Sequence, residues 1–185
     1  YGVPEKNIIL SGFPLPKELI GGSSATILKD LLVHRLCHLD PNGIFSEVHA
    51  RAMRAELGSA RCARKDGSYP LTLTYSVGGA GAQRQLGVKI LNSLKNKIAQ
   101  GKIRVNLVAG LRKDAAMFYR KAVTQAGLKK QLGTWVCVPE FDSRNAYFSG
   151  FNELLKSTDI LWTKPSELSF YTGLGIAVLM APPIG

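Results

Sequence analysis

TDILWTKPSEL at residues 158–168, followed by GIAVLMAPP at residues 175–183, decides the fold of this chain. An apolar strand runs into a polar turn, the Ser and Glu of that turn open a short helix, and a second apolar strand ends in prolines. This order places a hydroxyl, a carboxylate and free helix N-terminal amides at the carboxyl end of a strand. Open α/β sheets bind ligands at that end, so we expect a binding site there.

The same alternation of strands and helices extends back to residue 71. Parallel strands joined by helical crossovers are the packing that this order favours. The sequence therefore predicts an α/β fold, a Rossmann-like parallel sheet with helices on both faces. The expected strands are residues 71–77, 103–109, 134–138, 160–163 and 176–180, and the expected helices are residues 86–98, 114–125, 152–157 and 167–172.

Residues 1–70 follow a different pattern. A short β-prone run at residues 7–10 leads into a proline-rich turn, and leucines then recur at three- and four-residue spacing, which is typical of helices. We expect helices at residues 24–39 and 46–57, then a basic loop at residues 59–69. We interpret residues 21–70 as a helical insertion within a single domain that spans residues 1–185.

Composition indicates a globular chain with a basic surface. Of the 185 residues 45% are hydrophobic, the longest apolar run is too short to span a bilayer, and no signal peptide is visible. A start without Met indicates a piece of a longer protein. The net charge of +11 favours nucleic acid, anionic lipid headgroups or phosphorylated small molecules, with a solvated basic surface as the alternative.

Three widely spaced cysteines without a CxxC pair argue against a disulfide framework or a zinc ribbon. A reducing compartment is the default for such a chain. We therefore expect a cytoplasmic protein, one that can also lie peripherally at the inner face of a membrane.

A glycine-rich loop, residues 78–83, joins a predicted strand to a predicted helix. Glycines there allow backbone amides to approach a phosphate group at the helix N-terminus. A P-loop is excluded because no Gly-Lys-Ser/Thr ending follows, and Arg84 stands where a dinucleotide fingerprint needs its third glycine. A purely structural tight turn is the alternative.

A second group of polar residues comprises Thr163, Lys164, Ser166 and Glu167. A glutamate in the first turn of a helix can bind ribose hydroxyls, and the lysine can meet a phosphate. Ordinary helix capping, with Ser166 as the N-cap and Glu167 opposing the dipole, explains the same residues equally well.

Taken in order, these segments resemble the C-terminal, donor-binding half of GT-B glycosyltransferases. The similarity is closest to the branch that holds the peptidoglycan lipid-linked GlcNAc transferase and the monogalactosyldiacylglycerol synthases. The matching motifs are ILSGFP at residues 9–14, GGAGA at 78–82, FSGF at 148–151, TDILWTKP at 158–165, GIAVL at 175–179 and PPIG at 182–185.

The resemblance implies half of a GT-B fold that binds a nucleotide-diphosphate sugar, most often a UDP-sugar. It implies a glycine loop at the diphosphate, a Phe-containing loop at the base and Glu167 at the ribose. In that family a Glu stands where this chain has Phe170, and two glycines or a Gly-Ala pair stand where this chain has Ser166-Glu167. The implied donor-binding residues are Gly78, Gly79, Gly81, Ala82, Gln83, Phe148, Gly150, Phe151, Thr163, Lys164, Ser166 and Glu167.

Catalytic residues cannot be assigned, because the acceptor site and the catalytic base of such enzymes come from an N-terminal acceptor domain. We expect the 185-residue piece to need no cofactor and to be inactive alone. A nucleotide-sugar 2-epimerase of the same fold is an alternative. A non-catalytic basic module is another, and residues 51–65 could then contact an anionic membrane; no nucleic-acid motif is present.

His34, Cys37, His38 and Asp40 lie within two helical turns, so a metal site can be drawn. Because His34 and Cys37 share a face with core-like leucines, helix packing is the better interpretation, and we expect no metal.

Overall fold

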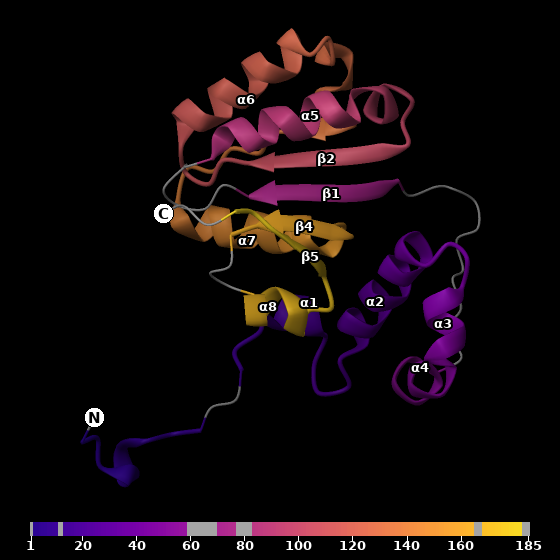
Figure 1. Ribbon diagram of the computed structural model, residues 1–185. Coiled ribbons are helices and arrows are strands. Elements are labelled where there is room, and N and C mark those ends of the chain that lie inside the picture. The colour runs from indigo at the N-terminus through magenta and orange to yellow at the C-terminus, as the bar shows by residue number, and fades with distance from the viewer. Residues whose placement is uncertain (1, 11–12, 59–69, 77–82, 165–167, 183–185) are drawn as a thin grey trace.

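The protein is a five-stranded parallel α/β sheet with helices on both faces, which confirms the predicted fold class (Figure 1). A computed structural model describes residues 2–10, 13–58, 70–76, 83–164 and 168–182. The strand order is β3-β2-β1-β4-β5, and all four pairings are parallel. The strands are β1 (Leu71–Ser76), β2 (Ile103–Val108), β3 (Val136–Cys137), β4 (Ile160–Thr163) and β5 (Ala177–Met180).

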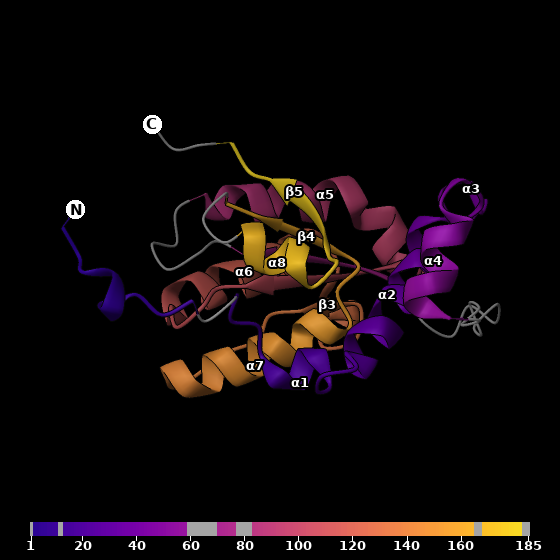
Figure 2. The same ribbon diagram turned by 90° about the horizontal axis from the view of Figure 1, so that it is seen from below.

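Each face of the sheet has its own helix layer and its own hydrophobic core. Helices α5 (Arg84–Ala99) and α6 (Lys113–Gln125) cover β1, β2 and β3, with Leu91, Val105 and Tyr119 fully buried between them. Helices α7 (Arg144–Lys156) and α8 (Leu168–Gly173) cover the other face, together with the short α1 (Lys17–Ile20). Figure 2 shows α1 lying beside α7.

The alternation of β1 distributes its side chains between these two cores. Leu73 and Tyr75 face α5 and α6, whereas the intervening threonines are buried on the α7 side. There the Asn106 amide donates to Thr74 Oγ1 at 3.0 Å, and the Thr74 and Thr158 hydroxyls lie 2.7 Å apart. The Thr158 hydroxyl in turn donates to the Leu154 carbonyl at 2.7 Å. This chain of hydrogen bonds satisfies polar groups that would otherwise be costly to bury.

The predicted helical insertion packs against the side of the sheet at which the parallel strands begin, which we call its amino edge; the strands end at the carboxyl edge. It forms α2 (Thr26–Leu39), α3 (Ile44–Val48) and α4 (Ala50–Leu57), so the expected second helix is divided at His49. Asp40 accepts hydrogen bonds from the amides of Phe45 and Ser46 and thereby fixes the start of α3. The buried residue of α2 is Arg35 and not one of its leucines, which was not predicted.

The β-prone run near the N-terminus forms no strand, and one expectation for local structure is wrong. Residues 8–10 do not form a strand: a 3₁₀ turn, η1 (Glu5–Asn7), precedes them, and their side chains are exposed because no strand in the described part of the chain pairs with them. The segment expected as a Phe-containing loop at residues 148–151 lies inside α7, which begins where Ser143 Oγ accepts from the Ala146 amide at 3.1 Å. A second 3₁₀ turn, η2 (Lys129–Gln131), follows α6.

The cysteines also differ from expectation. Cys37 is disulfide-bonded, whereas Cys137 is a free thiol. The cysteine pattern argued against a disulfide framework and did not lead us to expect a disulfide at Cys37. Within the described ranges, no helix is both long and apolar enough to cross a membrane.

Candidate functional site

The strand order creates a switch point between β1 and β4. The chain leaves β1 toward β2 and β3 on one side and reaches β5 from β4 on the other, so the connections diverge at the carboxyl ends of β1 and β4. These strands are neighbours, with Tyr75 in register with Trp162. Ligands of open α/β sheets bind in the crevice that such a divergence leaves. The two turns in which we predicted the site follow β1 and β4, the strands on either side of this switch point.

Part of the predicted site belongs to the described residues. Gly78, Gly79, Gly81, Ala82, Ser166 and Glu167 lie outside them. Gln83, Thr163 and Lys164 are described, and hydrogen bonds connect the first two through the residues that follow β5. The Ala181 amide donates to the Thr163 carbonyl at 2.8 Å, and the Gln83 side-chain amide donates to the Pro182 carbonyl at 2.7 Å.

Gln83 links the β1–α5 turn to the far side of the switch point. It precedes α5 with a left-handed backbone, φ 67°, and its carbonyl accepts from the Tyr75 hydroxyl at 2.9 Å. Burial raises the pKa of Tyr75 to about 12, so this hydroxyl remains a donor at neutral pH. Gln83 Oε1 is buried and has no hydrogen-bond partner among the residues that the structure describes. An unpaired buried acceptor is uncommon, and a bound donor group would satisfy it.

Lys164 supplies a positive charge at the same edge. It follows β4 directly, is partly exposed, and forms no ion pair within the described ranges. Thr163, the last residue of β4, is 4% exposed. Lys164 and the N-terminus of the 16-residue α5 follow the carboxyl ends of neighbouring parallel strands, an arrangement that favours a negatively charged group there.

Two arginines and an aspartate form a cluster at the N-terminal ends of α5 and α6. Asp114, in the first turn of α6, accepts from Arg112 at 3.1 Å and from Arg84 at 3.3 Å. The hydrogen bond with Arg112 is the main reason why the pKa of Asp114 is lowered. Arg84 also lies over the Phe118 ring at 4.9 Å. The sequence analysis noted Arg84 only as a departure from a glycine motif, so it missed this cluster.

The expected contact of residues 148–151 with a nucleotide base is wrong in its stated form. Their backbone belongs to α7, so it is occupied by helical hydrogen bonds. Phe151 is buried, stacked on Tyr147 at 5.6 Å and edge-on to Tyr171 at 6.3 Å. Gly150 gives the Phe141 ring room to lie against α7, whereas Phe148 is 62% exposed.

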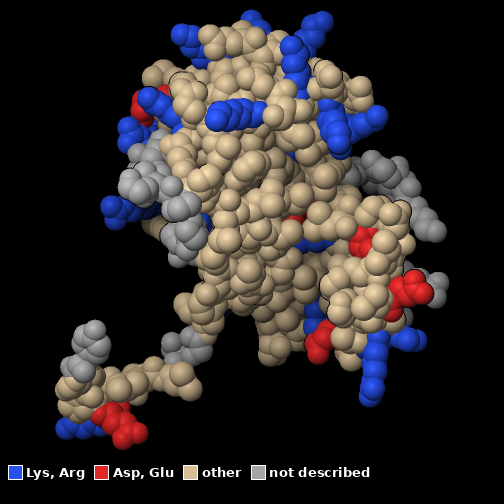
Figure 3. All heavy atoms as spheres, in the orientation of Figure 1, with Lys and Arg blue, Asp and Glu red and all other residues tan. Residues whose placement is uncertain are grey.

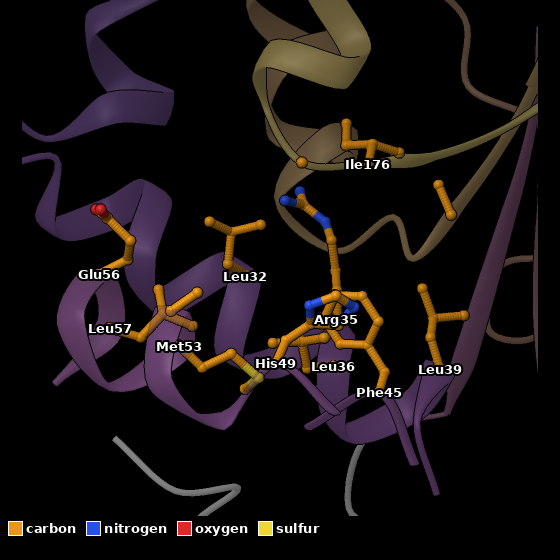
Figure 4. Close-up of a pocket in the computed structure, with 13 residues that line it drawn as sticks. Leu32, Arg35, Leu36, Leu39, Phe45, His49, Met53, Glu56, Leu57 and Ile176 are labelled. Carbon is orange, nitrogen blue, oxygen red and sulfur yellow. The ribbon is translucent and has the colours of Figure 1, made fainter. Parts of the chain in front are cut away.

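A second feature, which the sequence analysis missed, lies at the opposite edge of the sheet. A pocket of about 510 Å³ opens between the insertion helices and the turn before β5 (Figure 4). Most of its lining is apolar, and its polar side chains are Arg35, His49 and Glu56. Figure 4 shows Arg35 reaching from α2 toward Ile176.

Arg35 is already saturated with protein acceptors. Its guanidinium donates to the carbonyls of Leu155, Thr158 and Leu174 at 2.7–2.9 Å, which belong to the ends of α7 and α8. The pocket therefore offers an apolar surface rather than an anion site. Arg35 fixes the insertion to the sheet by capping two helices from a third.

Three of the four residues from which a metal site could be drawn, Cys37, His38 and Asp40, have other partners. His38 Nδ1 lies 2.9 Å from Asp159 Oδ1, and Asp159 Oδ2 accepts from the Thr72 amide at 2.7 Å. Burial raises the pKa of Asp159, although these hydrogen bonds oppose the shift. Asp40 caps α3 and Cys37 is disulfide-bonded, so these side chains stabilise the insertion.

Comparisons with known proteins place the chain in a family. A family model described as a domain of unknown function (DUF6938) matches residues 50–147. The match begins in α4 and runs through β1, α5, β2, α6 and β3 into α7. No curated protein and no solved structure matches the chain. Because the matched residues make up more than half of the 185, the chain belongs to the DUF6938 family.

Proposed function

We propose that this chain is the donor-binding domain of a GT-B-type glycosyltransferase and that it binds a nucleotide-diphosphate sugar, most simply a UDP-sugar. The observation that carries the proposal is the switch point. The glycine-rich connection after β1 and the Lys164 turn after β4 leave neighbouring parallel strands at the same edge. That arrangement suits a ligand that has a diphosphate between two hydrogen-bonding groups.

Two described side chains support a ligand of this chemistry. Lys164 provides a cation without an acidic partner among the described residues, which suits a diphosphate. Gln83 Oε1 provides a buried acceptor without a partner in the described part of the chain, which suits a ribose hydroxyl or a base N–H. A bound nucleotide would thus neutralise one group and satisfy the other.

The proposed role in catalysis is electrostatic. In transfer of a hexosyl group to an acceptor hydroxyl, negative charge develops on the departing nucleoside diphosphate. The amides at the N-terminus of α5 and the Lys164 ammonium would stabilise that charge in place. The base that activates the acceptor would come from an acceptor-binding domain paired with this one.

Calorimetry on the 185-residue chain tests the proposal. We expect UDP and UDP-sugars to bind and NAD to bind more weakly, with no sugar transfer by this piece alone. Gln83→Ala should weaken UDP binding about tenfold, because one hydrogen bond and the Pro182 link are lost. Gln85→Ala removes the same side chain from an exposed position in the first turn of α5 and should leave affinity unchanged. Tighter binding of NAD than of UDP, or no binding of either, would refute the proposal.

A further inference from the structure

The net charge of the chain is confined to one continuous segment. Residues 84–138 contain 12 Lys and Arg and a single acid, Asp114, and so carry the full +11. The remainder of the chain contains 12 residues of each sign and has no net charge. This segment comprises α5, β2, α6 and β3, which form one side of the molecule.

Within this segment the arginines are bound to the protein, whereas most lysines are not. Each arginine donates to a protein oxygen at 3.1–3.3 Å: Arg84 and Arg112 to Asp114, Arg120 to Glu140 and Arg104 to the Thr134 carbonyl. We call six of these lysines the lysine face: Lys95, Lys97, Lys102, Lys121, Lys129 and Lys130. All six are exposed and form no ion pair with any described residue.

The fold brings the lysine face together. Its members lie in the C-terminal halves of α5 and α6, in the turns that follow these helices, or in η2. Lys95 Nζ lies 3.6 Å from the position that a Cβ on Gly127 would take, so Lys95 extends from α5 to the end of α6. In Figure 3 blue side chains gather over the helix layer of α5 and α6, where red is scarce, whereas both colours occur over the lower part of the molecule.

We propose that the lysine face docks on an anionic membrane surface. Recognition of phosphates at fixed positions favours the bidentate arginine, but the arginines of this segment are engaged within the protein. Lysines on flexible stems suit headgroups that diffuse laterally. The aromatic residues of the segment, Phe118, Tyr119 and Trp135, are buried or half-buried, so single-stranded nucleic acid finds no fully exposed stacking platform among these lysines.

The lysine face is an alternative to the membrane contact expected at residues 51–65. Residues 59–65 lie outside the described residues. In the described part, Arg51 and Arg54 share the short α4 with Glu56, and Glu47 precedes them in α3. This mixture of signs weakens attraction to an anionic surface.

Vesicle co-sedimentation of the 185-residue chain tests the proposal. We expect binding to vesicles of phosphatidylcholine with 30% phosphatidylglycerol, release at high salt, and no binding to phosphatidylcholine alone. Each lysine near the surface should contribute about fivefold to the partition coefficient. The triple variant K95Q/K129Q/K130Q should therefore bind about 100-fold more weakly.

A matched control removes three charges elsewhere. In K6Q/K17Q/R51Q each substituted residue is exposed, and the net charge falls by the same amount. We expect this variant to bind vesicles within a fewfold of the wild type. Equal losses in the two variants would show that total charge alone is at work and would overturn the proposal, as would tighter binding to double-stranded DNA or RNA than to the anionic vesicles.

The two proposals can fail independently. The lysine face lies toward the amino edge of the sheet and the switch point lies at the carboxyl edge. The triple variant should therefore retain the UDP affinity of the wild type, and a loss of UDP binding in it would show that the substitutions disturb the fold. In that case the vesicle measurement is repeated with K102Q/K121Q, whose substitutions lie on the same face. We expect this variant to bind anionic vesicles about 25-fold more weakly than the wild type. A decrease below threefold would overturn the proposal.

Discussion

Replacing Arg35 with Met should cost more stability than any exposed arginine substitution. Arg35 is 4% exposed and donates three hydrogen bonds to main-chain carbonyls. Methionine keeps much of the stem but removes all three donors, which leaves buried carbonyls at the ends of α7 and α8 without partners. A hydrogen bond from a charged donor contributes roughly 1.5–3 kcal/mol, but the cost of burying the guanidinium offsets much of the sum.

We therefore expect R35M to lower the free energy of unfolding by about 3–5 kcal/mol, the usual cost of removing one partner from a buried charged group. Urea unfolding followed by circular dichroism gives this value by linear extrapolation. Since domains have only about 5–15 kcal/mol of stability, R35M could fail to fold, and R35K then supplies the measurement. Lysine offers a point charge in place of the fork, so we expect it to lose about 2 kcal/mol.

Arg120→Met is the matched control. Arg120 also donates to a carboxylate and a carbonyl, but its side chain is 45% exposed. Water can replace the lost partners, so we expect a change of at most about 1 kcal/mol. If R35M also stays within about 1 kcal/mol of the wild type, the insertion does not depend on the Arg35 contacts, and our reasoning about the amino edge is wrong.

Three further predictions concern other parts of the chain. Gly150→Ala should lower the melting temperature by several degrees, because the new Cβ meets the Phe141 ring. This overpacking outweighs the gain of about 1 kcal/mol in helix propensity. A higher melting temperature would contradict the close packing of Phe141 against α7. Burial raises the pKa of Asp159, so the native carboxyl holds its proton to higher pH than the unfolded one. Its contribution is complete below the ordinary aspartate pKa of 3.8 and is lost as the pH rises through the raised pKa of the native carboxyl. The unfolding free energy of the wild type relative to D159N should therefore fall as the pH rises above 3.8 in urea titrations, and a rise would show the opposite shift. Because Cys37 is disulfide-bonded and Cys137 is free, thiol titration of the denatured, unreduced protein should find one thiol. Reduction should raise the number of thiols to three. Three thiols before reduction would exclude the disulfide.

The sheet could be predicted because its signals are local. Residues 71–76 and 103–108 alternate or run apolar over the length of a strand, and the helices between strands carry apolar stripes. Each such signal is contained within a few neighbouring residues, and the order of elements then limits the topology to a few choices. The same reasoning placed Thr163 and Lys164 at the end of a strand, where the structure has them.

The failures of prediction come from contacts between residues that are distant in sequence. Arg35 is buried only because carbonyls 120 or more residues away accept its donors, and no pattern within α2 records that. Residues 8–10 have the composition of a strand, but strand formation also needs a partner, and the described sheet supplies none. The family resemblance implied a loop at residues 148–151, whereas the structure has a helix there, and the missing side chain of Gly150 allows Phe141 to approach it.

The direction of the helices explains why cations gather at the amino edge and why an anion should bind at the other. Helices that join parallel strands run opposite to them, so α5, α6 and α7 end at the amino edge of the sheet. Arg35 meets the end of α7 inside the protein, and the lysine face surrounds the ends of α5 and α6 in solvent. Cations at helix C-termini are stabilising, each by about 0.3–1 kcal/mol when exposed. The partial positive charge of α5 is directed toward the switch point, where Lys164 adds a full one, and a diphosphate there would complete the pairing of charges that the amino edge already has.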